Sequence, residues 1–252
     1  MTRKKKTVEL PEVSVSDDGE VRHLHLGTPW IQGSMRVREP FAIELEYVQR
    51  MMAWLLFVEP AGVPRRRALQ LGLGAGAITK FCHKKLRMKT QAIELNPQVL
   101  AVCRAWFKLP PDGPRLQVVL ADAAQEIRQP AYQGRIDALA VDLYDHEAAA
   151  PVLDSADFYA DCRALLSEDG AMTVNLFGRA SSYERSLASL KSAFGEGALW
   201  AFKPTREGNT VVLAQRTPSR PTRAELAARA QDLQARWALP TDKWLRVFRP
   251  VA

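Results

Sequence analysis

Cysteine and histidine are scarce in this chain. Of its 252 residues three are cysteines, Cys82, Cys103 and Cys162, and four are histidines. The cysteines are odd in number and far apart, which argues against a disulfide framework and offers no spacing typical of a zinc site. His23 and His25 share one face of an expected strand, but no third ligand accompanies them. We therefore expect reduced thiols in the core and no metal.

Long apolar segments are also absent. The longest, residues 51–58, lies between two charged residues and is too short to span a bilayer. The basic residues 3–6 are followed by no apolar segment of the kind that a secretory signal contains. These absences predict a cytoplasmic protein without a membrane partner.

The remaining composition is that of a globular protein, with 47% hydrophobic and 25% charged residues. The net charge is +7, and the basic residues are scattered along the chain. Since a solvated basic surface accounts for this pattern, we expect no nucleic-acid partner.

The first part of the chain alternates polar and apolar residues with the period of a β-strand. This pattern covers residues 8–37, interrupted by the turn residues 17–19, and predicts a small N-terminal sheet. Pro40 then opens an expected helix that runs to about Val58. We expect three parts: an N-terminal β-domain (1–38), a nucleoside-binding catalytic domain (39–218), and a C-terminal helix with a tail that lacks a clear element (219–252).

From Ala68 onward, strand patterns alternate with helix patterns. The expected strands are 68–72, 89–94, 116–121, 136–142, 171–177, 198–203 and 209–215, and the expected helices are 76–86, 97–107, 155–167, 181–194 and 222–237. Seven such strands predict a doubly wound α/β, Rossmann-like sheet. The short loop 204–208 suits an antiparallel hairpin, which favours the class I methyltransferase-type sheet over that of a dehydrogenase.

Three glycines follow the first of these strands at alternate positions: Gly72, Gly74 and Gly76. Glycine allows positive φ and lets a ligand approach the backbone, although it also serves ordinary tight turns. Between a strand and a helix, such a loop is typical of a nucleotide or nucleoside site. Glu94 ends the next strand, where a carboxylate can accept both hydroxyls of a ribose.

The next two strands also end in acidic residues. Asp122 follows the third strand and either accepts a hydrogen bond from an adenine amino group or caps the next helix. The fourth strand is followed by Asp142, Leu143, Tyr144, Asp145, His146 and Glu147. Such a charged segment is either a solvated loop or a site. We favour a site, because a carboxylate directly after an apolar strand can orient and deprotonate an attacking amine.

On these residues the chain resembles the spermidine synthase (polyamine aminopropyltransferase) family over residues 13–216. The similar segments are Trp30-Ile31-Gln32, Glu46-Tyr47, Ile93-Glu94-Leu95, Ala121-Asp122-Ala123 and Asp142-Leu143-Tyr144-Asp145. The resemblance implies that Asp142 assists the attacking amine and that Asp145 helps to hold it. It also implies a donor site made of Gln32, the three loop glycines, Glu94, Asp122 and Ala123.

One departure concerns the donor. Where this chain has Ala75, the family has an Asp that holds the amine of decarboxylated S-adenosylmethionine. We expect the loss of that Asp to weaken the preference for a decarboxylated donor.

The leading hypothesis is a transferase that uses S-adenosylmethionine or its decarboxylated form, without a metal, and a small-molecule amine acceptor. An S-adenosylmethionine-dependent methyltransferase and a non-catalytic nucleoside-binding relative stay open as alternatives. The dimers usual in the family point to a homodimer.

Overall fold

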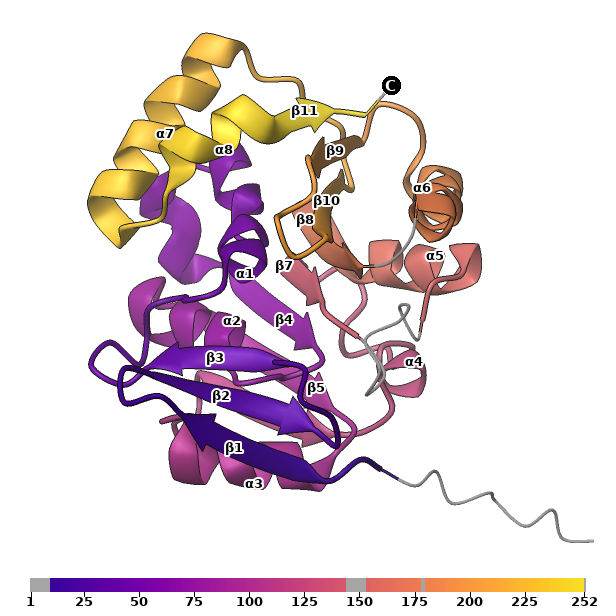
Figure 1. Cartoon of the computed structure of the whole chain (residues 1–252). Coiled ribbons are helices and arrows are strands. Elements are labelled where there is room, and N and C mark those ends of the chain that lie inside the picture. The colour runs from indigo at the N-terminus through magenta and orange to yellow at the C-terminus, as the bar shows by residue number, and fades with distance from the viewer. Residues whose placement is uncertain (1–9, 144–152, 178–179, 252) are drawn as a thin grey trace, which may run out of the picture.

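The computed structural model describes residues 10–143, 153–177 and 180–251, which form two β-sheets with helices around the larger one (Figure 1). Within these residues, no helix combines the length and the apolar composition that a bilayer crossing requires.

The smaller sheet is an antiparallel meander near the N-terminus. Its strands are β1 (Val13–Asp17), β2 (Val21–Leu26) and β3 (Gly33–Arg36). The β1–β2 turn closes because Asp18 Oδ1 accepts hydrogen bonds from the backbone N–H groups of Glu20 and Val21. β1 packs near α3 (Pro97–Trp106) and β3 near α2 (Ala77–Lys80). The predicted N-terminal sheet is confirmed, and it lies beside the glycine loop.

The larger sheet has eight strands in the order β11-β9-β10-β8-β7-β4-β5-β6. In chain order they are β4 (Arg67–Leu71), β5 (Lys89–Glu94), β6 (Leu116–Leu120), β7 (Ile136–Val141), β8 (Leu166–Phe177), β9 (Leu199–Phe202), β10 (Asn209–Gln215) and β11 (Phe248–Pro250). The five strands from β8 to β6 run parallel, and β9, β10 and β11 are antiparallel to their neighbours. The predicted doubly wound sheet and its closing hairpin are confirmed.

The order of the strands reverses between β4 and β7. From β4 the chain adds β5 and β6 on one side and then places β7 on the other side of β4. At such a switch point the connections leave in opposite directions, and a crevice forms beyond the carboxyl ends of the two strands. The glycine loop follows β4 and Asp142 follows β7, so both lie at this crevice.

Helices cover both faces of the larger sheet (Figure 1). One face packs against α1 (Glu46–Arg50), α2, α7 (Arg223–Trp237) and α8 (Thr241–Val247), and the other against α4 (Ala123–Glu126), α5 (Ala156–Leu165) and α6 (Ala180–Phe194). The strands contribute alternate side chains to the two cores: Ala138 and Ala140 to the first, and Leu139 and Val141 to the second. This alternation places Asp142 on the same side as α1.

The single helix predicted from Pro40 to about Val58 is wrong. The α-helix spans only Glu46–Arg50, and a 3₁₀-helix, Ala53–Phe57, follows it. The carbonyl oxygen of Met51 accepts a hydrogen bond from the hydroxyl of Thr173 on β8, and the N–H of Leu55 bonds to Met52. The bond from Thr173 thus takes the place of the α-helical hydrogen bond from the N–H of Leu55 to the carbonyl of Met51. The helical spacing of the apolar residues does not reveal this contact with the sheet.

The expectation of a tail without a clear element is also wrong. α8 is followed by β11, which pairs with β9 and extends the sheet from the expected seven strands to eight. The ring of Phe248 stacks on Phe202 at a centroid distance of 4.4 Å and on Trp200 at 5.3 Å. These aromatic contacts stabilise a strand too short to be predicted from its own residues. The division of the chain into three parts stays a prediction.

Candidate active site

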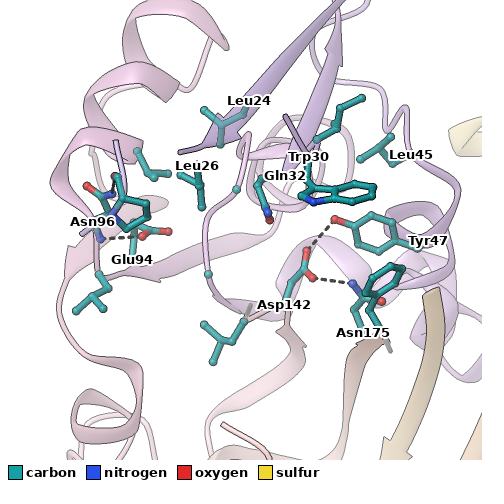
Figure 2. Close-up of a pocket in the computed structure, with 18 of the residues that line it drawn as sticks. Leu24, Leu26, Trp30, Gln32, Leu45, Tyr47, Glu94, Asn96, Asp142 and Asn175 are labelled. Carbon is teal, nitrogen blue, oxygen red and sulfur yellow. Dashed lines mark hydrogen bonds between the residues drawn. The ribbon is translucent and has the colours of Figure 1, made fainter. Parts of the chain in front are cut away.

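A cavity of about 750 Å³ is lined by the carboxyl ends of β4, β5, β7 and β8 and by the N-terminal sheet. Figure 2 shows Glu94 and Asn96 at one end of it and Tyr47, Asp142 and Asn175 at the other. The fold therefore brings into one cavity the strand ends that the sequence analysis selected.

Two of the loop glycines line this cavity and contact backbone from distant parts of the chain. Gly72 has a φ of +82°, and a Cβ there would lie 2.2 Å from the carbonyl oxygen of Asp142. A Cβ on Gly74 would lie 3.2 Å from the carbonyl oxygen of Gln32. Gly76 begins α2 with a φ of +67° and does not line the cavity. Glycine is thus required at 72 to admit the backbone of Asp142, and the predicted cofactor contact of Gly76 stays a prediction.

Glu94 lies almost fully buried at the end of β5. Its Oε2 accepts a hydrogen bond of 2.8 Å from the N–H of Leu73, and its Oε1 one of 2.8 Å from the N–H of Asn96. Burial raises the pKa of Glu94, and these backbone donors act in the opposite direction. The carboxylate also lines the cavity, so it can accept hydrogen bonds from a ligand there.

Asp122 and Ala123 line the cavity after β6. Asp122 is the N-cap of α4, because its Oδ1 accepts a hydrogen bond of 2.8 Å from the N–H of Ala124. The capping interpretation is therefore confirmed. The adenine contact predicted for Asp122 is compatible with its exposure at the cavity and stays a prediction.

Gln32 lines the cavity from the loop between β2 and β3. Its backbone N–H donates to Leu24, which fixes the loop to β2. Its side-chain Nε2 is buried and has no hydrogen-bond partner among the residues that the structure describes. A buried donor without a protein acceptor is costly unless a ligand or water supplies one. This supports the binding role that the sequence resemblance implied for Gln32.

Asp142 receives two side-chain hydrogen bonds. Tyr47 donates its hydroxyl to Oδ2 at 3.2 Å, and Asn175 donates Nδ2 to Oδ1 at 3.0 Å (Figure 2). Burial raises the pKa of Asp142, and these two donors act in the opposite direction. The result is an oriented carboxylate whose proton affinity is above that of an ordinary Asp, as a proton acceptor in catalysis requires.

Strand register explains why Asn175 meets Asp142. Val141 on β7 is level with Val174 on β8, so the next residues along these parallel strands are Asp142 and Asn175. Tyr47 comes from α1, on the face of the sheet to which Asp142 points. The predicted catalytic Asp145, together with Tyr144, His146 and Glu147, lies outside the described residues.

Sequence reasoning gave Asn175 no role, and it noted Tyr47 only as part of a family-like pair. Asn175 is a buried polar residue within the otherwise apolar end of β8, a pattern that could have identified it. Asn209 at the start of β10 carried no comparable signal, although it lines the cavity and donates its side-chain Nδ2 to Asn175 Oδ1 at 3.2 Å.

Ala75 packs against the N-terminal sheet. It is buried against β3, where a Cβ on Gly33 would lie 2.7 Å from the Cβ of Ala75. Ala75 does not line the cavity. An Asp at position 75 would therefore have to displace β3 or the loop.

Among the described residues, the charges that line the cavity are all negative. The carboxylates are those of Glu44, Glu46, Glu94, Asp122, Asp142 and Glu207, whereas no described Lys, Arg or His lines it. Glu44 pairs with Arg36 and Glu46 with Arg50, both from outside the cavity wall. Glu207, on the loop between β9 and β10, has no hydrogen-bond or ion-pair partner among the described residues. In a protein of net charge +7, this acidic lining indicates cationic ligands.

Searches for a matching family model found none. Among curated proteins, the chain is 34% identical over 232 residues to a polyamine aminopropyltransferase of Chromobacterium violaceum, covering 91% of this chain and 86% of that one. It is 33% identical over 237 residues to the protein of the same name from Neisseria meningitidis serogroup B, covering 93% and 88%.

Similar folds occur among solved structures. A probable spermidine synthase from Corynebacterium glutamicum superposes with a TM-score of 0.74 at 17% identity, covering 97% of this chain and 93% of that one. A spermidine synthase in complex with the transition-state analogue AdoDATO has a TM-score of 0.63 at 16% identity, covering 95% and 86%. Human methyltransferase-like protein 13, in complex with SAH, has a TM-score of 0.70 at 23% identity, covering 78% and 94%. At these identities the likeness establishes the fold.

Proposed function

The chain belongs to the polyamine aminopropyltransferase family, and on this premise we propose that it transfers an aminopropyl group from decarboxylated S-adenosylmethionine to a small-molecule amine. The observation that carries the proposal is the cavity itself. It combines a buried carboxylate suited to ribose, Glu94, with five further carboxylates and no described cation. Both the sulfonium donor and the protonated amine are cationic.

The same lining supports the decarboxylated donor. A donor that retains its carboxylate would bring a negative charge into a cavity where no described Arg or Lys can receive it. Repulsion by the acidic side chains would disfavour that donor. The preference for the decarboxylated donor would thus arise from the negative charge of the cavity lining. It would not need the Asp that the family has where this chain has Ala75. No observation at the cavity favours the methyltransferase alternative.

Asp142 would remove the proton from the attacking amine. Its carboxylate is held by Tyr47 and Asn175, so the lone pair that accepts the proton has a set direction. Because the pKa of Asp142 is raised, this carboxylate is a stronger base than an ordinary Asp, and its basicity is closer to that of the amine.

The bound donor supplies a carbon next to its sulfonium, and methylthioadenosine is released as the new C–N bond forms. Glu94, Gln32 and Asp122 are the residues that would hold the nucleoside part. With so good a leaving group, orienting the two reactants and freeing the lone pair of the amine provide most of the catalysis.

The test combines a transfer assay with calorimetry. The wild-type protein is incubated with decarboxylated S-adenosylmethionine and putrescine, and methylthioadenosine is measured by chromatography. Product formation, together with tighter binding of the decarboxylated donor than of S-adenosylmethionine, is the expected result. Binding that favours S-adenosylmethionine, or binding without transfer to putrescine or any longer polyamine, would refute the proposal. The homodimer, the cytoplasmic location and the lack of a nucleic-acid partner stay predictions from the sequence.

A further inference from the structure

The orientation of the Asn175 amide decides whether its NH₂ group or its oxygen faces the carboxylate of Asp142. Asn175 is buried on β8 and directs its Nδ2 to Asp142 Oδ1 at 3.0 Å. An amide carries two donors on one side and an acceptor on the other, and the two are nearly equal in size. Rotated by half a turn, the same side chain would place its oxygen against the carboxylate.

One residue of the hairpin opposes that rotation. Asn209 Nδ2 donates to Asn175 Oδ1 at 3.2 Å, so the oxygen of Asn175 is held on the side away from Asp142. The register explains the contact: Asn209 is level with Phe177 and Val211 with Asn175, so the two Asn side chains are diagonal neighbours on one face of the sheet.

The hairpin fixes Asn209 independently of its side chain. The backbone N–H of Asn209 donates to Thr205 Oγ1 at 3.2 Å, and its carbonyl oxygen accepts from the N–H of Thr205 at 2.8 Å. Gly208 precedes it with a φ of +99°, and a Cβ there would lie 3.2 Å from the ring of Phe177. The backbone at position 209 would therefore keep its place if the side chain were removed.

We propose that Asn209 is a positioning residue, which holds the amide of Asn175 in the orientation that donates to Asp142 and thereby keeps Asp142 able to accept a proton from the amine. The inference rests on the proposed role of Asp142 in catalysis. It assigns the β9–β10 hairpin to the catalytic apparatus, through a chain of hydrogen bonds that runs from β10 across β8 to the end of β7.

Other titratable groups near Asp142 also contribute to the pH dependence of the protein. Tyr47 from α1 is the described titratable group in direct contact with it. The further acids of the same cavity are Glu44 before α1, Glu46 on α1, Glu94 on β5, Asp122 after β6 and Glu207 on the hairpin. Arg50 is bonded to Glu46 and to the carbonyl oxygen of Lys203. None of these groups is altered by a substitution at position 209.

The first experiment is the pH dependence of kcat/KM for Asn209→Ala. The substitution removes the hydrogen bond from Asn209 that opposes rotation of the Asn175 amide. An amide oxygen turned toward Asp142 favours the protonated carboxyl. The acidic limb of the profile should move up by roughly 0.5–1 pH unit, the effect of losing about one neutral hydrogen bond. Thr210→Val is the matched control. Thr210 is the next residue on β10, so its side chain points to the opposite face of the sheet. The pH profile of Thr210→Val should equal that of the wild type.

A double-mutant cycle separates this effect from general damage to the hairpin. In an Asn175→Ala background the amide is absent, so Asn209→Ala should cause no further shift of the profile. A shift of equal size in both backgrounds, or a wild-type profile for Asn209→Ala, would overturn the proposal.

The second experiment needs no turnover. Because the pKa of Asp142 is raised on folding, its contribution to stability is present at low pH and is lost as the pH rises through the folded pKa. Asn209→Ala should enlarge this loss as the pH rises above the ordinary pKa of an Asp, measured by denaturant unfolding across a pH series. It should have no such effect in an Asp142→Asn background.

If Asn209→Ala changes the pH dependence of unfolding no more than Thr210→Val does, the positioning role is wrong. A wild-type protein that transfers no aminopropyl group would instead refute the proposed function, and the unfolding series would still decide the orientation of Asn175.

Discussion

Replacing Glu94 by Gln removes one negative charge from the end of β5 at nearly constant volume. In the wild-type protein both carboxylate oxygens accept backbone hydrogen bonds, from Leu73 and from Asn96, each at 2.8 Å. The amide of Gln has one oxygen, so its NH₂ group must face one of these two N–H donors. The substitution therefore affects the ribose site and the glycine loop together.

The two effects differ in size. The two ribose hydroxyls that donate to a carboxylate form charge-assisted hydrogen bonds. Losing one of these bonds should weaken the binding of methylthioadenosine by roughly 1.5–3 kcal/mol, or about 10- to 150-fold in Kd. The unsatisfied backbone N–H should cost about 1–3 kcal/mol of stability. Relief of the desolvation that raises the pKa of Glu94 offsets part of that loss.

Isothermal titration with methylthioadenosine at pH 7.5 measures the first effect, and thermal unfolding the second. The pH dependence of methylthioadenosine affinity provides a further test. Affinity of the wild type should fall as the pH drops through the raised pKa of Glu94, because the protonated carboxyl has lost its charge. For Glu94→Gln the affinity should not change over that range.

Glu126→Gln is the matched control, since it removes a carboxylate on α4 that does not line the cavity. Its affinity for methylthioadenosine should equal that of the wild type. A Glu94→Gln protein that binds methylthioadenosine within twofold of the wild type would refute the assignment of the ribose site.

Three further substitutions test the rest of the cavity. Asp142→Asn should lower the rate of methylthioadenosine formation by roughly 10²- to 10⁴-fold, with methylthioadenosine affinity within a few-fold of wild type and an equal or higher Tm at pH 8; a lower Tm with normal turnover would contradict the catalytic role. Ala75→Asp should lower the Tm without changing the ratio of donor affinities, because the new carboxylate would be buried against Gly33. A stable variant that gains preference for the decarboxylated donor would show that the loop faces the donor tail. Glu207→Gln should raise the KM for a cationic amine by roughly two- to fivefold at unchanged kcat, less so at high salt, as for an exposed ion pair; steady-state kinetics with an unchanged KM would place the acceptor elsewhere.

Local patterns were sufficient for the order of the elements and for much of the cavity. The apolar segments of β4, β5 and β7 read as buried strands, and in a doubly wound sheet the carboxyl ends of such strands meet. Glu94 and Asp142 could therefore be assigned to one site from their positions alone. The N-cap Asn96, which accepts from Gln98, likewise follows from short-range chemistry.

Side-chain partners from distant elements could not be obtained in this way. Tyr47 bonds to Asp142 across 95 positions of the chain, and Asn175 across 33. Both contacts depend on strand register and on which face of the sheet α1 covers. A shift of one residue between β7 and β8 would send Asn175 to the opposite face.

The break after α1, the burial of Ala75 and the pairing of β11 have the same origin. The Met51 carbonyl bonds to Thr173, Ala75 packs on Gly33, and Phe248 stacks on Phe202. The sequence by itself determined the alternation of strands and helices, the glycine loop and the acidic strand ends, because these depend on neighbouring residues and on the period of apolar positions. Only the tertiary structure decided which donors hold Asp142 and which side chains face the cavity, because those contacts join residues that no local pattern relates.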